Sequence, residues 1–170
     1  MIYNTAIYDG QYLTYTNKGG RTGAVGDELV SPNKEHTLKF DPKNNIYLYN
    51  KGVLIWDLKK ATGKSWSEDF ASSQSNVFEL KKDRLRLRKI GIGNLPDIIL
   101  WEYKFDGIDQ NSRKRLRIDD TGNLFLETET AGQWKNFWQL KPDSVKTDKN
   151  SIVLPLLIGS AVLYYTYFRK

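Results

Sequence analysis

The sequence predicts an all-β domain followed by one membrane-spanning helix near the C-terminal end of the chain. Three observations lead to this prediction. Aromatic residues make up 13% of the 170 positions, with ten Tyr and five Trp. Apolar residues alternate with polar ones between Gly, Asn and Asp turn signals, as is typical of strands. Finally, an uncharged apolar run occupies the last part of the chain, and no helical stripe of three turns precedes it.

The first element is an N-terminal segment, residues 1–36, expected to form strands and a loop that pack on the rest of the β domain. Tyr12, Leu13 and Tyr15 follow the turn signal Asp9-Gly10. Residues 18–26 are rich in glycine and predict a loop, because glycine accepts backbone conformations that other residues avoid.

The second element, residues 37–141, is predicted to contain three related strand–turn–strand units. The stretch from Leu38 to Leu48 aligns without a gap with the stretch from Leu116 to Leu126, and a shorter copy starts at Phe78. The copies begin about 40 residues apart, and units of this size rarely bury their apolar face alone. Three copies are therefore expected to close around one core, each with a tryptophan: Trp56, Trp101 and Trp134.

The last elements are a polar linker at 142–150, a transmembrane helix at 151–168 and a basic tail at 169–170. The run from Ile152 to Phe168 carries no charge, and as a helix it would span roughly 26 Å of a bilayer core. A proline in the first turn and tyrosines near the far end suit such a span. The residues expected to mark the anchor are Ile152, Pro155, Gly159, Tyr164, Tyr165 and Tyr167.

The location follows from what precedes the anchor. Residues 1–10 show no secretory signal, and the chain has no cysteine and no Asn-x-Ser/Thr sequon, which argues against an extracellular protein. We expect a single-pass membrane protein whose domain faces the cytosol, or the capsid side of a viral membrane. Basic residues flank the anchor on both sides, so the charge rule leaves its orientation open.

The repeated units resemble the bulb-type mannose-binding lectins over residues 38–140. In that family each repeat carries a Q-x-D-x-N-x-V-x-Y motif whose polar side chains bind sugar hydroxyls, and the domain is a threefold β-prism. In this chain Asn45 and Tyr49 match the motif, with Asp41 in the place of its Gln, and the third copy keeps only Asn123. The resemblance implies a glycan site at these four residues, with much of the motif missing. A β-trefoil also consists of three repeats of similar length and is the alternative fold.

Catalysis, cofactors and metals find little support in the sequence. His36 is the single histidine and follows Glu35 in a polar stretch, where we expect a surface residue. With no cysteine and one histidine, a transition-metal site is not predicted, and a calcium-loop spacing is absent. Glu127 and Glu129 share one strand face, which leaves a hydrolase as the third class of function. We therefore predict a protein that is not an enzyme and has no cofactor.

A row of arginines alternates with leucines in two of the three copies. Alternation places these arginines on one side of each strand, where they would supply most of the net charge of +6. Such a basic face would attract acidic protein surfaces or anionic lipid headgroups, or it would simply keep strand edges from pairing. Nucleic acid ranks lowest as a partner, because no aromatic platforms interleave with the row. The residues are Arg84, Arg86, Arg88, Arg115 and Arg117.

Together these features predict a membrane-anchored structural subunit without enzymatic activity. The bilayer would hold residues 151–168, and neighbouring proteins of a large assembly would contact the β domain. A minor capsid protein of a large virus with an internal membrane has this build, as does an accessory subunit of a membrane complex. The alternative is a membrane-tethered lectin that binds glycans.

Overall fold

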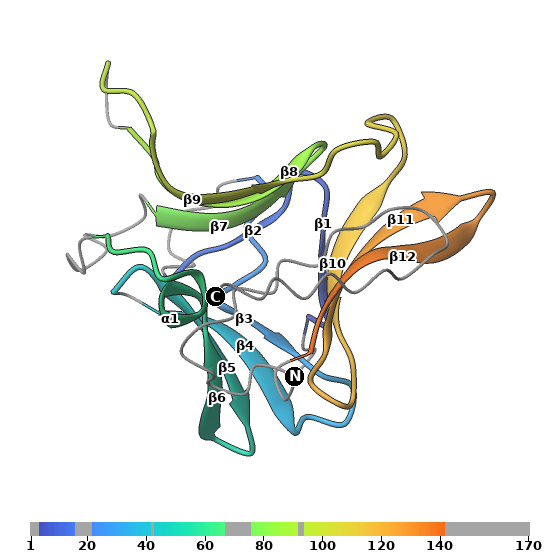
Figure 1. Ribbon diagram of the computed structural model, residues 1–170, viewed down its shortest axis with the longest axis horizontal. Helices are drawn as coiled ribbons and strands as arrows, with labels where there is room; N and C mark the ends of the chain where they lie inside the picture. The colour runs from blue at the N-terminus through green and yellow to red at the C-terminus, as the bar shows by residue number, and fades with distance from the viewer. Residues whose placement is uncertain (1–3, 16–21, 42, 67–75, 92–93, 142–170) are drawn as a thin grey trace, which may run out of the picture.

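The computed structural model describes residues 4–15, 22–41, 43–66, 76–91 and 94–141. Three four-stranded sheets stand around a common interior (Figure 1), so the predicted all-β class is confirmed. The described part holds one short helix, α1 (Leu58–Thr62), and twelve strands: β1 (Ala6–Tyr8), β2 (Tyr12–Leu13), β3 (Glu28–Val30), β4 (His36–Asp41), β5 (Asn45–Asn50), β6 (Val53–Asp57), β7 (Asn76–Lys81), β8 (Arg84–Lys89), β9 (Ile98–Lys104), β10 (Lys114–Ile118), β11 (Leu124–Thr130) and β12 (Gln133–Leu140).

Each sheet combines three consecutive strands with one strand from the N-terminal segment. We call the sheets A (β1-β10-β11-β12), B (β2-β7-β8-β9) and C (β3-β4-β5-β6). Strands β1, β2 and β3 pair antiparallel with β10, β7 and β4, respectively. The N-terminal segment therefore runs along all three sheets in turn and joins them. Three separate sheets of this kind are consistent with a prism.

The three copies share their strand register. Leu38 lies opposite Leu48, Phe78 opposite Leu87, and Leu116 opposite Leu126. In every copy the register to the next strand shifts directly after that second leucine. A bulge at one position bends and twists all three hairpins alike, which lets their inner faces enclose one core.

The third tryptophan of the repeat is Trp138, and the expectation of Trp134 is wrong. Trp56, Trp101 and Trp138 lie opposite the leucine that precedes each bulge. Trp134 instead lies opposite Glu129, nearer the hairpin turn. The prediction assumed that the tryptophan lies at the same sequence distance from the start of each copy. It was wrong because β11 continues for more residues after its bulge than β5 does, so the residue opposite the leucine comes later in the chain.

The core lies between the three inner faces. Each N-terminal strand contributes one completely buried side chain, Ile7, Leu13 or Leu29. They meet buried residues of the copies, among them Leu38, Phe40, Leu48, Leu80, Leu87, Leu116 and Leu126. Burying one such side chain stabilises the fold by about 1.5–3 kcal/mol relative to leaving it exposed.

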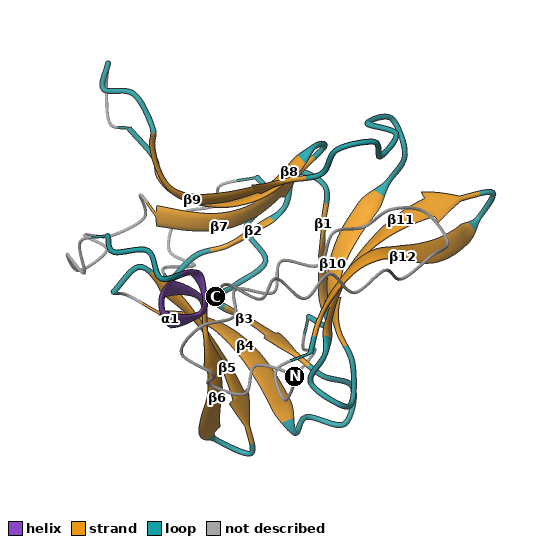
Figure 2. Cartoon of the chain, in the orientation of Figure 1, coloured by secondary structure: helices purple, strands orange, loops and turns teal. Residues whose placement is uncertain are grey.

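Helix α1 is short and follows sheet C directly (Figure 2). The Asp57 side chain caps its first turn by accepting a hydrogen bond from the Lys60 N–H, and Gly63 ends it with φ 62°. In the part of the chain that the structure describes, no helix is long and apolar enough to cross a membrane. The predicted linker, anchor and basic tail at 142–170 lie outside the described residues, so they stay predictions.

Candidate functional site

The outer faces of the three sheets carry different chemistry. The strand that follows the first turn of each copy presents two outward positions, one before and one after the bulge. In sheet B these positions hold Arg86 and Arg88, and in sheet A they hold Phe125 and Glu127. In sheet C they hold Tyr47 and Tyr49.

On sheet B two arginines bind the same buried carboxylate, that of Glu79. Glu79 of β7 accepts hydrogen bonds from Arg86 and from both Nε and Nη2 of Arg88, the last two at 2.9 Å. Burial by itself would raise the pKa of Glu79. The hydrogen bonds and charges of Arg88 and Arg86 outweigh burial and hold that pKa below its ordinary value.

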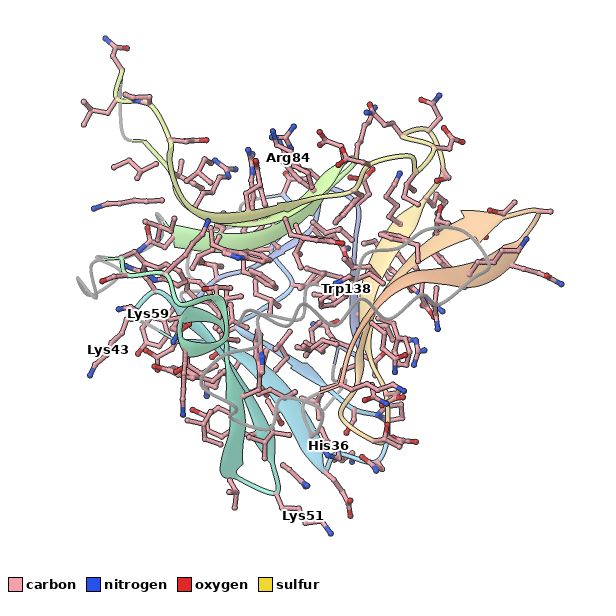
Figure 3. The ribbon with its side chains drawn as sticks, in the orientation of Figure 1. His36, Lys43, Lys51, Lys59, Arg84 and Trp138 are labelled. Atoms are coloured by element: carbon pink, nitrogen blue, oxygen red, sulfur yellow. The ribbon has the colours of Figure 1, made fainter. Side chains whose placement is uncertain are left out.

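Further ion pairs occupy the rest of this face. Arg84 bonds to Asp83 and, at 2.8 Å, to Glu102, and Arg88 also bonds to Asp97. Figure 3 shows Arg84 on the side of sheet B that faces away from the other two sheets. The three arginines predicted as a basic face here therefore each have a carboxylate partner within the domain.

Sheet A repeats this arrangement around Glu127 of β11. Arg115 and Arg117 both bond to this carboxylate, which is 4% exposed. Their guanidinium groups also cover aromatic rings, Arg115 over Trp134 at 4.1 Å and Arg117 over Phe125 at 4.7 Å. The five arginines of the predicted row point outward, but buried or half-buried carboxylates neutralise much of their charge.

The proposed carboxylate pair of a hydrolase is divided between different partners. Glu127 is held by Arg115 and Arg117, whereas Glu129 bonds to Arg113 at 2.8 Å. Each carboxylate serves an ion pair on the outer face of sheet A.

The described strands of sheet C hold no arginine–carboxylate cluster and present tyrosines instead. The rings of Tyr47 and Tyr49 are 6.2 Å apart and both are half-buried. Tyr47 lies opposite Lys39 on one side and Asp57 on the other. Burial raises the pKa of Tyr49, and the charges of Asp41 and Asp57 raise it further. Its phenol therefore remains a hydrogen-bond donor beside two carboxylates.

Asn45 has a structural task that the sequence did not reveal. Its side chain is 3% exposed, donates to Asp57 Oδ1 at 2.8 Å and accepts from the Lys59 N–H at 3.2 Å. It thereby ties the start of α1 to β5. Its amide is used within the fold and is not presented on the surface.

The four residues implied by the lectin resemblance lie on two sheets. Asp41, Asn45 and Tyr49 belong to sheet C, where Asp41 also accepts the Lys43 N–H at 2.8 Å in a turn. Asn123 belongs to the first turn of sheet A, where it donates to Thr121 at 2.6 Å. Sequence reasoning missed Tyr47 and Asp57, although the alternation of β5 was a signal for Tyr47.

His36 was expected on the surface, and that expectation is wrong. It is 6% exposed and packs against Gly122, between the start of β4 and a turn of sheet A (Figure 3). Within the described ranges, no group of three or more His, Cys, Asp or Glu residues could hold a metal ion.

Comparisons with known proteins bear on the fold. The sequence matches no family model and no curated protein. The structure is similar to that of a Japanese Marasmius oreades lectin, with a TM-score of 0.51, 13% identity, and coverage of 81% of this chain and 90% of the lectin. It is also similar to a monomeric monocot mannose-binding lectin from Gastrodia elata, with a TM-score of 0.50, 12% identity, and coverage of 80% and 96%. At this level of identity the likeness concerns architecture, and the chain has a lectin-like all-β fold.

Proposed function

We propose that this domain is a carbohydrate-binding module whose site is the outer face of sheet C. One observation carries the proposal. At the outward positions where sheets A and B place arginine–carboxylate clusters, sheet C places two adjacent tyrosines beside Asp41 and Asp57. Among the described residues of this face there is no buried arginine–carboxylate cluster, and the ion pair between Lys39 and Asp27 is exposed, with 4.0 Å between its charged atoms.

The chemistry of these groups suits a neutral sugar. A tyrosine ring packs against the apolar face of a pyranose while its hydroxyl donates a hydrogen bond, and carboxylate oxygens accept from sugar hydroxyls. The Gastrodia elata lectin with a similar architecture is described as mannose-binding, which supports mannosides as the first ligands to test. The Asn45 side chain bonds to Asp57 and to the Lys59 N–H within the fold. Tyr47 and Tyr49 are therefore the residues expected to contact the sugar.

The test is a glycan array followed by calorimetric titration of methyl α-mannoside and of any sugar that the array identifies. We expect saturable binding, weakened about tenfold or more by Tyr49→Ala and by Tyr47→Ala. Tyr15→Ala is the matched control, because Tyr15 is 47% exposed and lies outside sheet C. Absence of saturable binding to every neutral sugar by the folded protein overturns the proposal, as does binding that survives both substitutions in sheet C.

The second candidate is a membrane-anchored structural subunit, such as a minor capsid protein or an accessory subunit of a membrane complex. The uncharged run from Ile152 to Phe168 supports it. So do Leu95, Ile98 and Ile99, whose exposed fractions are 71%, 55% and 44%. They lie where the connection into β9 projects from the body of the molecule (Figure 1). Large apolar residues grouped on a surface are typical of contact sites.

Flotation of the full chain with liposomes tests this second role. The chain is expected to float, and the double substitution Leu157→Lys and Val162→Lys is expected to abolish flotation, since each buried charge costs about 2.5–3.5 kcal/mol near the centre of a bilayer. A full chain that stays at the bottom of the gradient argues against the anchor. The sugar titration is independent of this outcome.

A further inference from the structure

A pocket with a volume of about 280 Å³ lies where sheets A and B meet. Its walls are the turn after β1, the turn between β7 and β8, and the loop that precedes β10. Ligand pockets usually measure about 300–1,000 Å³. The size therefore suits a ligand no larger than a substituted monosaccharide.

Hydrogen bonds hold these walls in place. The Asp9 N–H donates to the Lys114 carbonyl at 3.1 Å on the sheet A side, and the Gly10 N–H donates to the Leu80 carbonyl at 2.9 Å on the sheet B side. In the opposite wall, the Ser112 hydroxyl bonds to Asp109 O at 2.7 Å and to the Thr128 hydroxyl at 2.6 Å. The pocket is thus built into the fold, and a ligand would find its shape already formed.

Positive charge predominates among the lining residues. They include Lys82, Arg113 and Lys114, against the single carboxylate of Asp9. Lys114 is completely buried, and its Nζ donates to the carbonyls of Asp109 and Ser112 at 2.7 and 3.0 Å. The carboxylates of Asp9, Asp83 and Asp109 balance part of this charge. Since the ammonium is buried, it acts on an anion in the pocket through its charge and not by direct contact.

An aromatic edge adjoins these charges. Tyr8 lines the pocket and is 36% exposed, and its ring packs against that of Trp134 with an interplanar angle of 60° and 6.0 Å between the ring centroids. The Arg113 guanidinium lies over the same tryptophan at 5.8 Å and also bonds to Glu129. These contacts fix both the ring and the cation at the rim.

We propose that this pocket binds a monosaccharide that carries a phosphate or sulfate group. Lys82 and Arg113 contact the oxyanion, Lys114 supplies charge from below, and Tyr8 packs against the sugar ring. The pocket belongs to the junction of sheets A and B and shares no residue with the sheet C face. The inference is therefore independent of the proposed neutral-sugar site.

The experiment is calorimetric titration of the full chain, at low ionic strength, with glucose 6-phosphate, glucose 6-sulfate, inorganic phosphate and glucose. We expect saturable binding of at least one sugar ester, weaker binding of inorganic phosphate and none of glucose at this pocket. Lys82→Gln and Arg113→Gln should each raise the Kd of the ester about tenfold. Tyr8→Ala should weaken binding of the ester and leave the Kd of inorganic phosphate unchanged.

Lys60→Gln is the matched control, because it removes the same charge from an exposed position in α1, outside the pocket. It should leave the Kd unchanged, and Tyr49→Ala on sheet C should do the same. The proposal is overturned if neither ester binds, if both pocket substitutions leave the Kd unchanged, or if Lys60→Gln weakens binding as much as they do. Lys82 and Arg113 are exposed residues, so their replacement should leave the protein folded, which circular dichroism verifies.

Discussion

Glu79 and Glu127 are buried carboxylates that each bind two arginines, yet they occupy opposite strands of their hairpins. Glu79 lies on the first strand of its copy and receives Arg86 and Arg88 from the second, whereas Glu127 lies on the second strand. The two clusters are thus not the same repeated position. What they share is the physical requirement that a buried charge on a sheet face be paired and hydrogen-bonded.

The first prediction concerns the free energy of unfolding of Glu79→Gln. Removing this charge leaves Arg86 and Arg88 without their common partner in a site where they are 14% and 15% exposed. We expect a loss of about 3 kcal/mol, measured by urea unfolding. Glu35→Gln is the control, because its pair with Lys51 is exposed and should contribute less than about 1 kcal/mol. Equal losses in the two variants would contradict the assignment.

The second prediction concerns the thermal stability of the fold at low pH. The pKa values of Asp83, Asp97 and Asp119, like that of Glu79, lie below their ordinary values. Arg84 lowers the pKa of Asp83, and the Gly91 N–H and Arg88 lower that of Asp97. At Asp119, burial would raise the pKa, but hydrogen bonds from Thr121 and Asn123 lower it by more.

A lowered carboxyl pKa stabilises the folded state fully above the unfolded pKa and loses this effect as the pH falls through the folded pKa. The Tm should therefore be steady down to about pH 5 and fall between about pH 4 and pH 2. Calorimetry across this range is the measurement. A Tm that stays constant down to pH 2 would show that these pairs do not stabilise the fold.

The third prediction compares two glycines. Gly122 has φ +79°, and a Cβ there would come within 2.4 Å of the His36 ring. Gly132 has a similar φ of +76° but nothing within 4 Å of such a Cβ. Gly132→Ala should cost about 1 kcal/mol for the backbone alone, and Gly122→Ala about 2–4 kcal/mol because the packing clash is added. Chemical denaturation of both variants separates backbone strain from the clash with His36. Equal losses in the free energy of unfolding would exclude the clash.

The fourth prediction tests the corrected tryptophan of the repeat. Trp138 packs against the core and lies 5.8 Å from Tyr103, ring to ring, whereas Trp134 contacts Tyr8 and arginines on the outer face. Trp138→Ala should lower the free energy of unfolding by about 3–5 kcal/mol, and Trp134→Ala by about 1–2 kcal/mol. If Trp134→Ala were the more damaging, the register described here would be wrong.

Much of the architecture could be predicted from local pattern. Side chains alternate between faces every second residue, so the gapless match of the segments starting at Leu38 and Leu116 indicated equivalent hairpins, and both show the same pairing of leucines. The outward direction of the arginine row followed from the same alternation. The predicted anchor at 151–168 rests on hydropathy alone.

The residues of the candidate sites were harder to predict, because their roles depend on partners distant in the chain. Asn45 matched a sugar-binding position, but the Lys59 N–H from which it accepts a hydrogen bond lies beyond the following strand. The pocket at the junction of sheets A and B draws its walls from three separate segments around Tyr8, Lys82 and Lys114. No local pattern brings these segments together.

The sequence by itself determined which segments are strands and which face of each strand is apolar, because side-chain alternation and turn chemistry are local. Only the tertiary structure decided that Glu79 and Glu127 neutralise the arginine row and that Tyr47 and Tyr49 are the outward pair without such a cluster. Those outcomes depend on hairpin length, bulge position and the packing of strands against one another, and these properties arise when the three sheets close around their core.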